Sequence, residues 1–186
     1  PVDMFAVRPD RKGPKSVAVL MFLGALLLAF QAYGDYQLHS AEDLSEEEIN
    51  TLLQTPNSQA GDGDEVTVEQ YQAFHDDARE SGGYLVRAVG LGIGVSLMFI
   101  GSILLFQLKP LGAWLNVSGA VTGLGSGIIG SWLVGGAATA NLAGPLLLTY
   151  EILMYFCGVC MFTCIGLAAL PLLNARARLA LYPNPE

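Results

Sequence analysis

Charge is scarce in this chain, and positive charge is scarcest where the acidic residues gather. Asp, Glu, Lys and Arg make up 14% of the 186 residues, whereas soluble domains typically contain about 25%. Residues 35–83 hold thirteen of the seventeen acidic residues but only one basic residue, Arg79. Because phosphate contacts require Lys and Arg, this segment is excluded as a nucleic-acid surface.

Sequence motifs of catalysis and nucleotide binding are also missing. The chain has no P-loop, no HExxH pair and no order of Ser, His and Asp that predicts a hydrolase. Its two histidines, His39 and His75, are expected to be isolated surface residues. No internal repeat is visible, so an inverted-repeat transporter is not supported. These absences favour a non-catalytic protein.

Long hydrophobic runs, in contrast, are abundant. Mean hydropathy is +0.46, and four runs reach the roughly 20 apolar residues that cross a bilayer. The predicted spans are residues 16–34, 84–108, 111–135 and 146–173. Four basic residues precede the first run as in a signal peptide, but residues 31–34 make a poor cleavage site, so a retained anchor is expected. The prediction is an all-α, integral membrane four-helix bundle with a small extracytoplasmic helix-loop-helix between spans one and two.

Positive charge beside the spans predicts their orientation. With four spans, only Arg79 and Arg87 fall on one side of the membrane, and the other side receives Arg8, Arg11, Lys12, Lys15, Lys109, Arg176 and Arg178. By the positive-inside rule, residues 1–15 and 174–186 are cytoplasmic, and residues 35–83 and 136–145 are outside. The plasma membrane is the expected location.

The acidic segment 35–83 has the pattern of two short helices. Ser45 with Glu48, and Thr67 with Gln70, are capping-box pairs that start helices. Pro56 is expected to end the first helix. The predicted order is therefore helix, acidic glycine-rich loop, helix.

This segment resembles a single EF-hand over about residues 44–78, through LSEEEI, GDGDEV and VTVEQYQAF. The resemblance implies calcium, for which the candidate ligands are Asp62, Asp64, Glu65 and Glu69. An EF-hand loop needs a bidentate Glu at position twelve. If Val66 takes the apolar position eight, position twelve is Gln70, and the other register puts Glu65 at position eight. A small folded cap that binds no metal is the alternative.

Small residues mark the faces on which spans two and three are expected to pack. They recur every four residues along span three and twice in span two, a glycine-zipper pattern that brings backbones close together. The positions are Gly119, Gly123, Gly127, Ser131, Gly135, Gly90 and Gly94. Because the turn before Pro110 is short, spans two and three are predicted to form an antiparallel hairpin.

Span four contains an acidic residue, Glu151. Charged residues within spans are costly and usually paired. Arg87 lies at a similar predicted depth in span two, so an Arg87–Glu151 ion pair is expected. The alternatives are a Glu151 that reaches water, or a small transporter or channel in which Glu151 relays a proton or cation.

All three cysteines also lie in span four. Cys157-Gly158-Val159-Cys160 resembles the CxxC of membrane thiol oxidoreductases of the vitamin K epoxide reductase type, which are also four-helix proteins. That resemblance implies Cys157 and Cys160 as the catalytic pair. The alternative is that they pack as small apolar side chains, since a thiol in hydrocarbon is a poor nucleophile.

The function that the sequence favours is an accessory or structural subunit. Such a protein would pack through glycine-rich helix faces against other membrane protein subunits in the lipid bilayer. A thiol oxidoreductase and a small transporter remain the alternatives.

Overall fold

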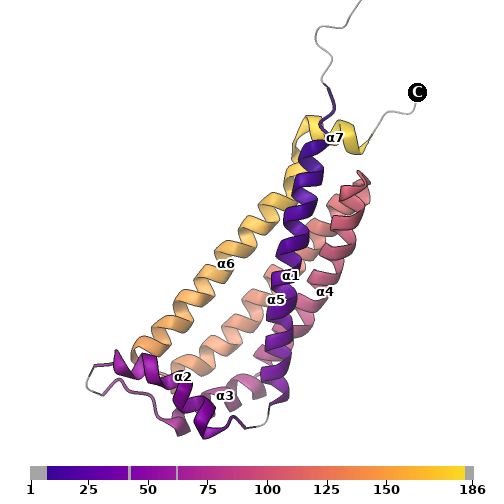
Figure 1. Cartoon of the computed structure of the whole chain (residues 1–186). Helices are drawn as coiled ribbons and strands as arrows, with labels where there is room; N and C mark the ends of the chain where they lie inside the picture. Colours follow the sequence, from indigo (N-terminus) through magenta and orange to yellow (C-terminus); the bar gives the residue numbers. More distant parts are fainter. Residues whose placement is uncertain (1–7, 42, 62, 183–186) are drawn as a thin grey trace, which may run out of the picture. The chain divides into compact units, whose positions relative to one another are not determined.

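The structure, a computed structural model, describes residues 8–41, 43–61 and 63–182. Within this part of the chain there are seven α-helices and no strand (Figure 1). They are α1 Lys12–Ser40, α2 Glu46–Ser58, α3 Val68–Glu80, α4 Gly83–Phe106, α5 Pro110–Asn141, α6 Gly144–Leu173 and α7 Ala175–Leu181. The helices α1, α4, α5 and α6 are long and apolar enough to cross a membrane. The prediction of an all-α protein with four spans is confirmed.

The long helices extend beyond the predicted spans. Helix α1 runs to Ser40 and α5 to Asn141, instead of ending at residues 34 and 135. The expected loop 136–145 therefore shrinks to residues 142–143. With 29 to 32 residues each, α1, α5 and α6 are about 44–48 Å long, longer than the roughly 30 Å of a hydrocarbon core. Hydropathy detected the most apolar part of each helix and missed the less apolar turns that continue it.

The chain forms two compact units, and each long helix contributes to both. The first unit comprises Pro1–Ala29, Gly92–Gly123 and Met161–Glu186, and the second comprises Phe30–Leu91 and Leu124–Cys160. Along the chain, α1 and α5 each begin in the first unit and end in the second, whereas α4 and α6 each begin in the second and end in the first. The basic residues that predicted the orientation all belong to the first unit, and the acidic segment belongs to the second.

In the first unit, all four long helices contribute to one apolar core. Its buried residues are Val17, Ala18, Met21, Ala25, Met98, Leu105, Ala113, Ala120, Ala168 and Leu181. The backbones of α4 and α5 lie very close, because a Cβ placed on Gly94 would be 2.7 Å from the Gly119 carbonyl oxygen. The turn between them is closed by Lys109 N–H, which donates to Leu104 O at 2.9 Å. The predicted hairpin is present.

The ends of the chain add polar contacts to the first unit. The carboxylate of Asp10 accepts hydrogen bonds from the Lys12 and Gly13 N–H groups at 2.9 and 3.1 Å, which caps α1. The Asp10 N–H donates to the Arg176 carbonyl at 2.9 Å. Helix α7 lies within the predicted cytoplasmic tail and buries Leu181 in the core.

In the second unit, the acidic segment folds into a cap, defined as residues 43–61 and 63–80, on the adjoining ends of α4, α5 and α6. Both capping boxes are formed as predicted, at Ser45 and Thr67. The shared core contains Ile49, Leu53, Val66, Tyr71, Phe74, Ala78, Tyr84, Val134, Ala137, Ala138, Leu142 and Leu146. Pro56 does not end α2, which continues to Ser58. Only Asn57 and Ser58 follow this proline in α2, so it interrupts the last turn and not the middle of the helix.

Candidate functional site

A cavity of about 630 Å³ lies within the second unit, between α5 and α6. Most of its wall is apolar and comes from these two helices, including Trp132, Gly135, Tyr150 and Met154. Sites for small molecules are typically mostly apolar cavities of about 300–1,000 Å³ with a few polar groups. The cavity therefore has the size and lining of a binding site, and its charged residues decide what it can bind.

A buried ion pair between Arg87 of α4 and Asp35 of α1 lies beside the cavity. The Arg87 Nε donates to both carboxylate oxygens of Asp35, at 3.2 and 3.1 Å, and its Nη2 contacts the same carboxylate. The side chains of Arg87 and Asp35 are 19% and 3% exposed. Arg87 lines the cavity, but its charge is neutralised by this bidentate contact.

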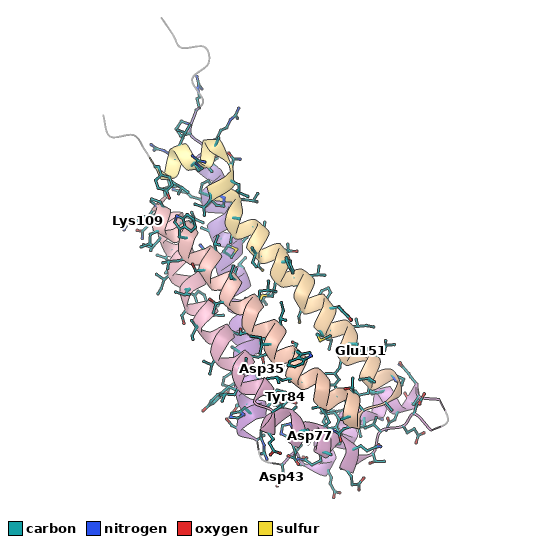
Figure 2. All side chains as sticks on the ribbon, turned by 180° about the vertical axis from the view of Figure 1, so that it is seen from behind. Asp35, Asp43, Asp77, Tyr84, Lys109 and Glu151 are labelled. Carbon is teal, nitrogen blue, oxygen red and sulfur yellow. The ribbon has the colours of Figure 1, made fainter. Side chains whose placement is uncertain are left out.

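Two neighbours fix the position of Arg87. Its guanidinium lies over the ring of Tyr84, with 5.9 Å from Cζ to the ring centroid, which is a cation–π distance. Figure 2 labels Tyr84 together with Asp35. The stem of Arg87 crosses Gly130 of α5, where any Cβ would overlap its Cγ. Gly130 is therefore required for the ion pair, a role that the four-residue spacing did not indicate.

The ion pair corrects an expectation from the sequence. Arg87 pairs with Asp35 and not with Glu151. The sequence predicts that Asp35 belongs to the acidic segment after span one, but α1 continues past it to Ser40, and its carboxylate pairs with Arg87 of α4. A charged residue at the end of a long apolar run is easily mistaken for the start of a loop.

Glu151 stands on α6 and lines the cavity (Figure 2). It lies seven residues after Gly144, the first residue of α6, or about 10 Å along the helix. Its side chain is exposed, and no group in the described part of the chain forms an ion pair or hydrogen bond with it. The three charges near the cavity, Asp35, Arg87 and Glu151, therefore sum to −1.

The four-residue series on α5 serves two different surfaces. Gly119 and Gly123 face α4 in the first unit. In the second unit, Gly127 has open space at its Cβ position, and Ser131 and Gly135 line the cavity. Four residues of an α-helix turn through about 400°, so each step rotates the series by about 40°. The first residues of the series therefore contact α4, and the last ones line the cavity.

The predicted small residues of α4 each meet α5. A Cβ on Gly90 would overlap the side chain of Ser126, within the second unit. Gly94 meets Gly119 within the first unit. Larger side chains at either position would therefore force the two helices apart.

The cysteines of the CxxC pattern form no disulfide. Cys157 is half-buried and lines the cavity, whereas Cys160 is exposed. Cys164 belongs to the first unit. The cavity wall thus contains one of the two thiols that the resemblance to thiol oxidoreductases implied.

Hydrogen bonds to its backbone hold the acidic loop in place. The Asn57 side chain donates to Val66 O at 2.8 Å and accepts from Val66 N–H at 3.0 Å. Gln70, at position twelve in the register that Val66 sets, accepts from the Thr67 N–H at 2.9 Å. A Cβ on Gly144 would lie 2.8 Å from Asp64, so this loop rests on the turn before α6.

The predicted calcium ligands do not gather in the region that the structure describes. Asp64, Glu65 and Glu69 are all exposed, and Asp62 lies outside the described residues. No group of three His, Cys, Asp or Glu side chains among the described residues is placed to hold a metal ion.

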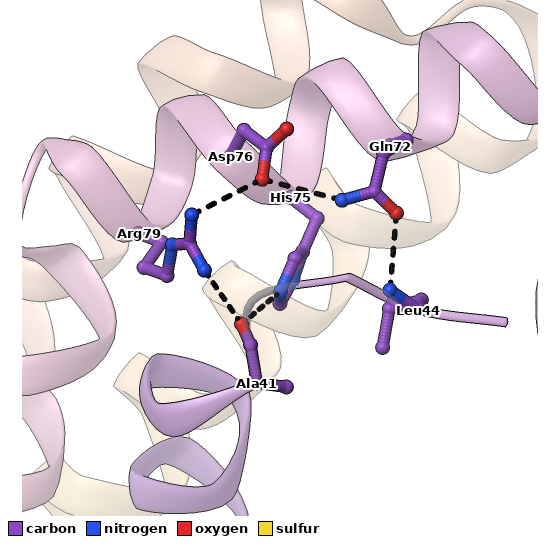
Figure 3. A network of polar contacts seen from close by, with 6 residues as sticks. All are labelled: Ala41, Leu44, Gln72, His75, Asp76 and Arg79. Carbon is purple, nitrogen blue, oxygen red and sulfur yellow. Dashed lines mark hydrogen bonds and ion pairs between the residues drawn. The ribbon is translucent and has the colours of Figure 1, made fainter.

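A polar network joins α3 to the segment after α1 (Figure 3). The Ala41 carbonyl contacts His75 Nε2 at 3.1 Å and accepts from Arg79 at 2.9 Å. Arg79 also pairs with Asp76 at 3.5 Å. His75 is 1% exposed, so the expectation of a surface histidine is wrong. It occupies an apolar position of α3, and its ring contacts a backbone carbonyl that the sequence did not reveal.

Comparisons with known proteins add no relative. No protein-family model matches the chain, and no curated protein or solved structure matches it either. The functional argument therefore depends on the cavity, its charges and the exposed helix faces.

Proposed function

We propose that this protein is a non-catalytic accessory subunit of a larger membrane protein complex, and that it packs against a partner helix through an open face of α5. That face consists of Gly125, Ile128, Ile129, Trp132 and Gly136. The observation that carries the proposal is the open space at Gly125 and Gly136, where an added Cβ would meet nothing within 4 Å.

Glycines on two different faces of α5 have different surroundings, and this difference supports the proposal of a partner helix. Gly119 and Gly130 are needed for contacts with α4 and Arg87, so their small size is explained within the chain. Neither Gly125 nor Gly136 contacts α4 or Arg87 in this way, although Gly136 also lines the cavity. Glycine weakens an α-helix by about 1 kcal/mol relative to alanine. Two such residues, eleven apart on one side of a helix, suit the close approach of a second helix.

The exposed side chains between these glycines support the same role. Ile128 and Ile129 are 54% and 55% exposed, and Trp132 is 75% exposed. Large side chains beside small ones give a helix the ridges and hollows that a partner helix fits. The proposal includes the predicted orientation, with both termini in the cytoplasm and the cap outside, and the plasma membrane as the location.

Blocking the open face tests the proposal. The tagged chain and its Gly125→Leu and Gly136→Leu variants would be purified from native membranes in mild detergent and weighed by native mass spectrometry. The expected result is a stoichiometric membrane-protein partner that both variants lose. Gly92→Leu is the matched control, because Gly92 is also open but lies on α4.

Three outcomes would contradict the proposal: a monomer, a homo-oligomer alone, or a partner that both variants retain. Circular dichroism would confirm that the variants fold. A loss of the partner in Gly92→Leu as well would show that bulk anywhere on the lipid-facing surface disrupts the complex, which also contradicts a specific face.

A further inference from the structure

We propose that the cavity between α5 and α6 binds an amphiphile with a primary ammonium head, which pairs with Glu151, and an alkyl chain, which lies along the apolar wall. This inference does not depend on the accessory-subunit proposal, but the cavity shares Trp132 and Gly136 with the open face of α5.

The charge around the cavity favours an ammonium head group. Glu151 lines the cavity and has no partner in the described part of the chain. Among the described residues that line the cavity, Arg87 is the only cation, and it is paired with Asp35. A carboxylate on a membrane-spanning helix is costly unless it is paired. The net charge of −1 around the cavity therefore favours a cation and disfavours a carboxylate or sulfate.

The neighbouring aromatic residues suit the same head group. Trp132 and Tyr150 line the cavity on either side of the α5–α6 gap. Ammonium groups bind to the faces of such rings by cation–π attraction. The ring of Tyr150 is packed edge-to-face on Phe74 at 5.0 Å, so its position is set before a ligand arrives.

The length of the cavity accounts for the alkyl chain. Its α6 wall runs from Leu147 to Cys157, which is about 15 Å along the helix axis. Beyond Glu151 the α6 wall consists of Leu153, Met154 and Cys157, which offer no strong hydrogen-bonding group. An alkyl chain is the ligand part that this wall suits, because it requires no polar partner.

Trp132 provides a built-in reporter. The chain has two tryptophans, and Trp114 belongs to the first unit. In a Trp114→Phe variant, bromine on an alkyl chain in the cavity would quench Trp132 fluorescence. The probes are 12-bromododecylamine, 12-bromododecanol and 12-bromododecanoic acid, added to the protein in unbrominated maltoside micelles.

The amine is expected to reach half-maximal quenching at about tenfold lower concentration than the alcohol, with the acid weakest. Glu151→Gln should remove this preference, while Glu151→Asp should keep it if Gln impairs folding. The Trp132→Phe variant, whose remaining tryptophan is Trp114, should show no preference. Equal quenching by all three probes, a preference that Glu151→Gln leaves intact, or the same preference at Trp114 would overturn the proposal.

A second arm identifies the source of the ammonium. The Trp114→Phe variant would be placed in liposomes that contain acyl-brominated phosphatidylethanolamine, phosphatidylcholine or phosphatidylglycerol. Stronger quenching by phosphatidylethanolamine that requires Glu151 would identify a lipid head group. Equal quenching by the three lipids, together with a preference for the free amine, would identify a single-chain amine.

Discussion

Among the residues that the structure describes there are two ion pairs, one buried and one exposed, and they should respond very differently to the loss of one charge. Asp35→Asn would leave Arg87 buried without its carboxylate. Breaking a buried pair costs about 3–5 kcal/mol. Since Arg87 is 19% exposed, water relieves part of this penalty, and we expect the free energy of unfolding to fall by about 3 kcal/mol.

The second pair provides the control. Arg79 and Asp76 are 3.5 Å apart with side chains 30% and 45% exposed. Exposed pairs contribute about 0–1 kcal/mol, so Asp76→Asn should change the free energy of unfolding by less than about 1 kcal/mol. Both variants would be unfolded with sodium dodecyl sulfate in mixed micelles and followed by circular dichroism.

A double variant separates the charge from the packing. Replacing a buried ion pair by apolar residues of similar volume is often neutral or stabilising, so Asp35→Leu with Arg87→Met should recover most of the stability that Asp35→Asn loses. The reasoning would be refuted if Asp35→Asn cost no more than Asp76→Asn. It would also be refuted if the double variant were less stable than Asp35→Asn.

Three further predictions concern the helix contacts and the cap. Gly94→Ala should lower the free energy of unfolding by about 1–3 kcal/mol, since its Cβ would lie 2.7 Å from a backbone oxygen of α5. Gly92→Ala, which has open space, should not lower it and should raise it by up to about 1 kcal/mol; both variants would be measured by detergent unfolding. Hydrogen bonds from the hydroxyl and then the backbone N–H of Ser45 lower the pKa of the Glu48 carboxyl below its ordinary value. The stability that the Glu48 carboxylate contributes is therefore complete above the unfolded pKa and is lost as the pH falls through the lowered folded pKa. Hydrogen-exchange protection of α2 should therefore drop on acidification, less so in Glu48→Gln, while Glu46→Gln should follow the unmodified protein. Asn57→Ala removes two hydrogen bonds of 2.8 and 3.0 Å to the loop backbone and should destabilise the cap by about 1–3 kcal/mol, seen as faster hydrogen exchange in α2 and α3 but not in α6; uniform exchange across all three helices would contradict a local role.

The features that local sequence determines were predictable. Four apolar runs give four long helices because length and hydropathy decide which segments cross a bilayer. The capping boxes at Ser45 and Thr67 form because each needs only residues three apart. The hairpin of α4 and α5 followed from a short turn and from small residues that permit close backbones.

The features that depend on distant residues were not predictable. Asp35 and Arg87 are 52 positions apart, and nothing near either residue identifies the other. His75 is buried, and its ring contacts the carbonyl of Ala41, which belongs to a segment without regular structure. The cavity arises from the separation of α5 and α6, for which the four-residue spacing of small residues gave no indication.

The distance between Asp35 and Arg87 along the chain also has a consequence for synthesis. A ribosome adds about 5–20 residues per second, so the separation of 52 positions delays the arginine by about 3–10 s. During that time the newly synthesised α1 carries Asp35 near its C-terminal end without the arginine that pairs with it. We expect the aspartate to wait at the membrane surface until α4 arrives, after the cap has been translated. The ion pair would then form late, and it would fix α1 against α4 only after both helices and the cap have been made.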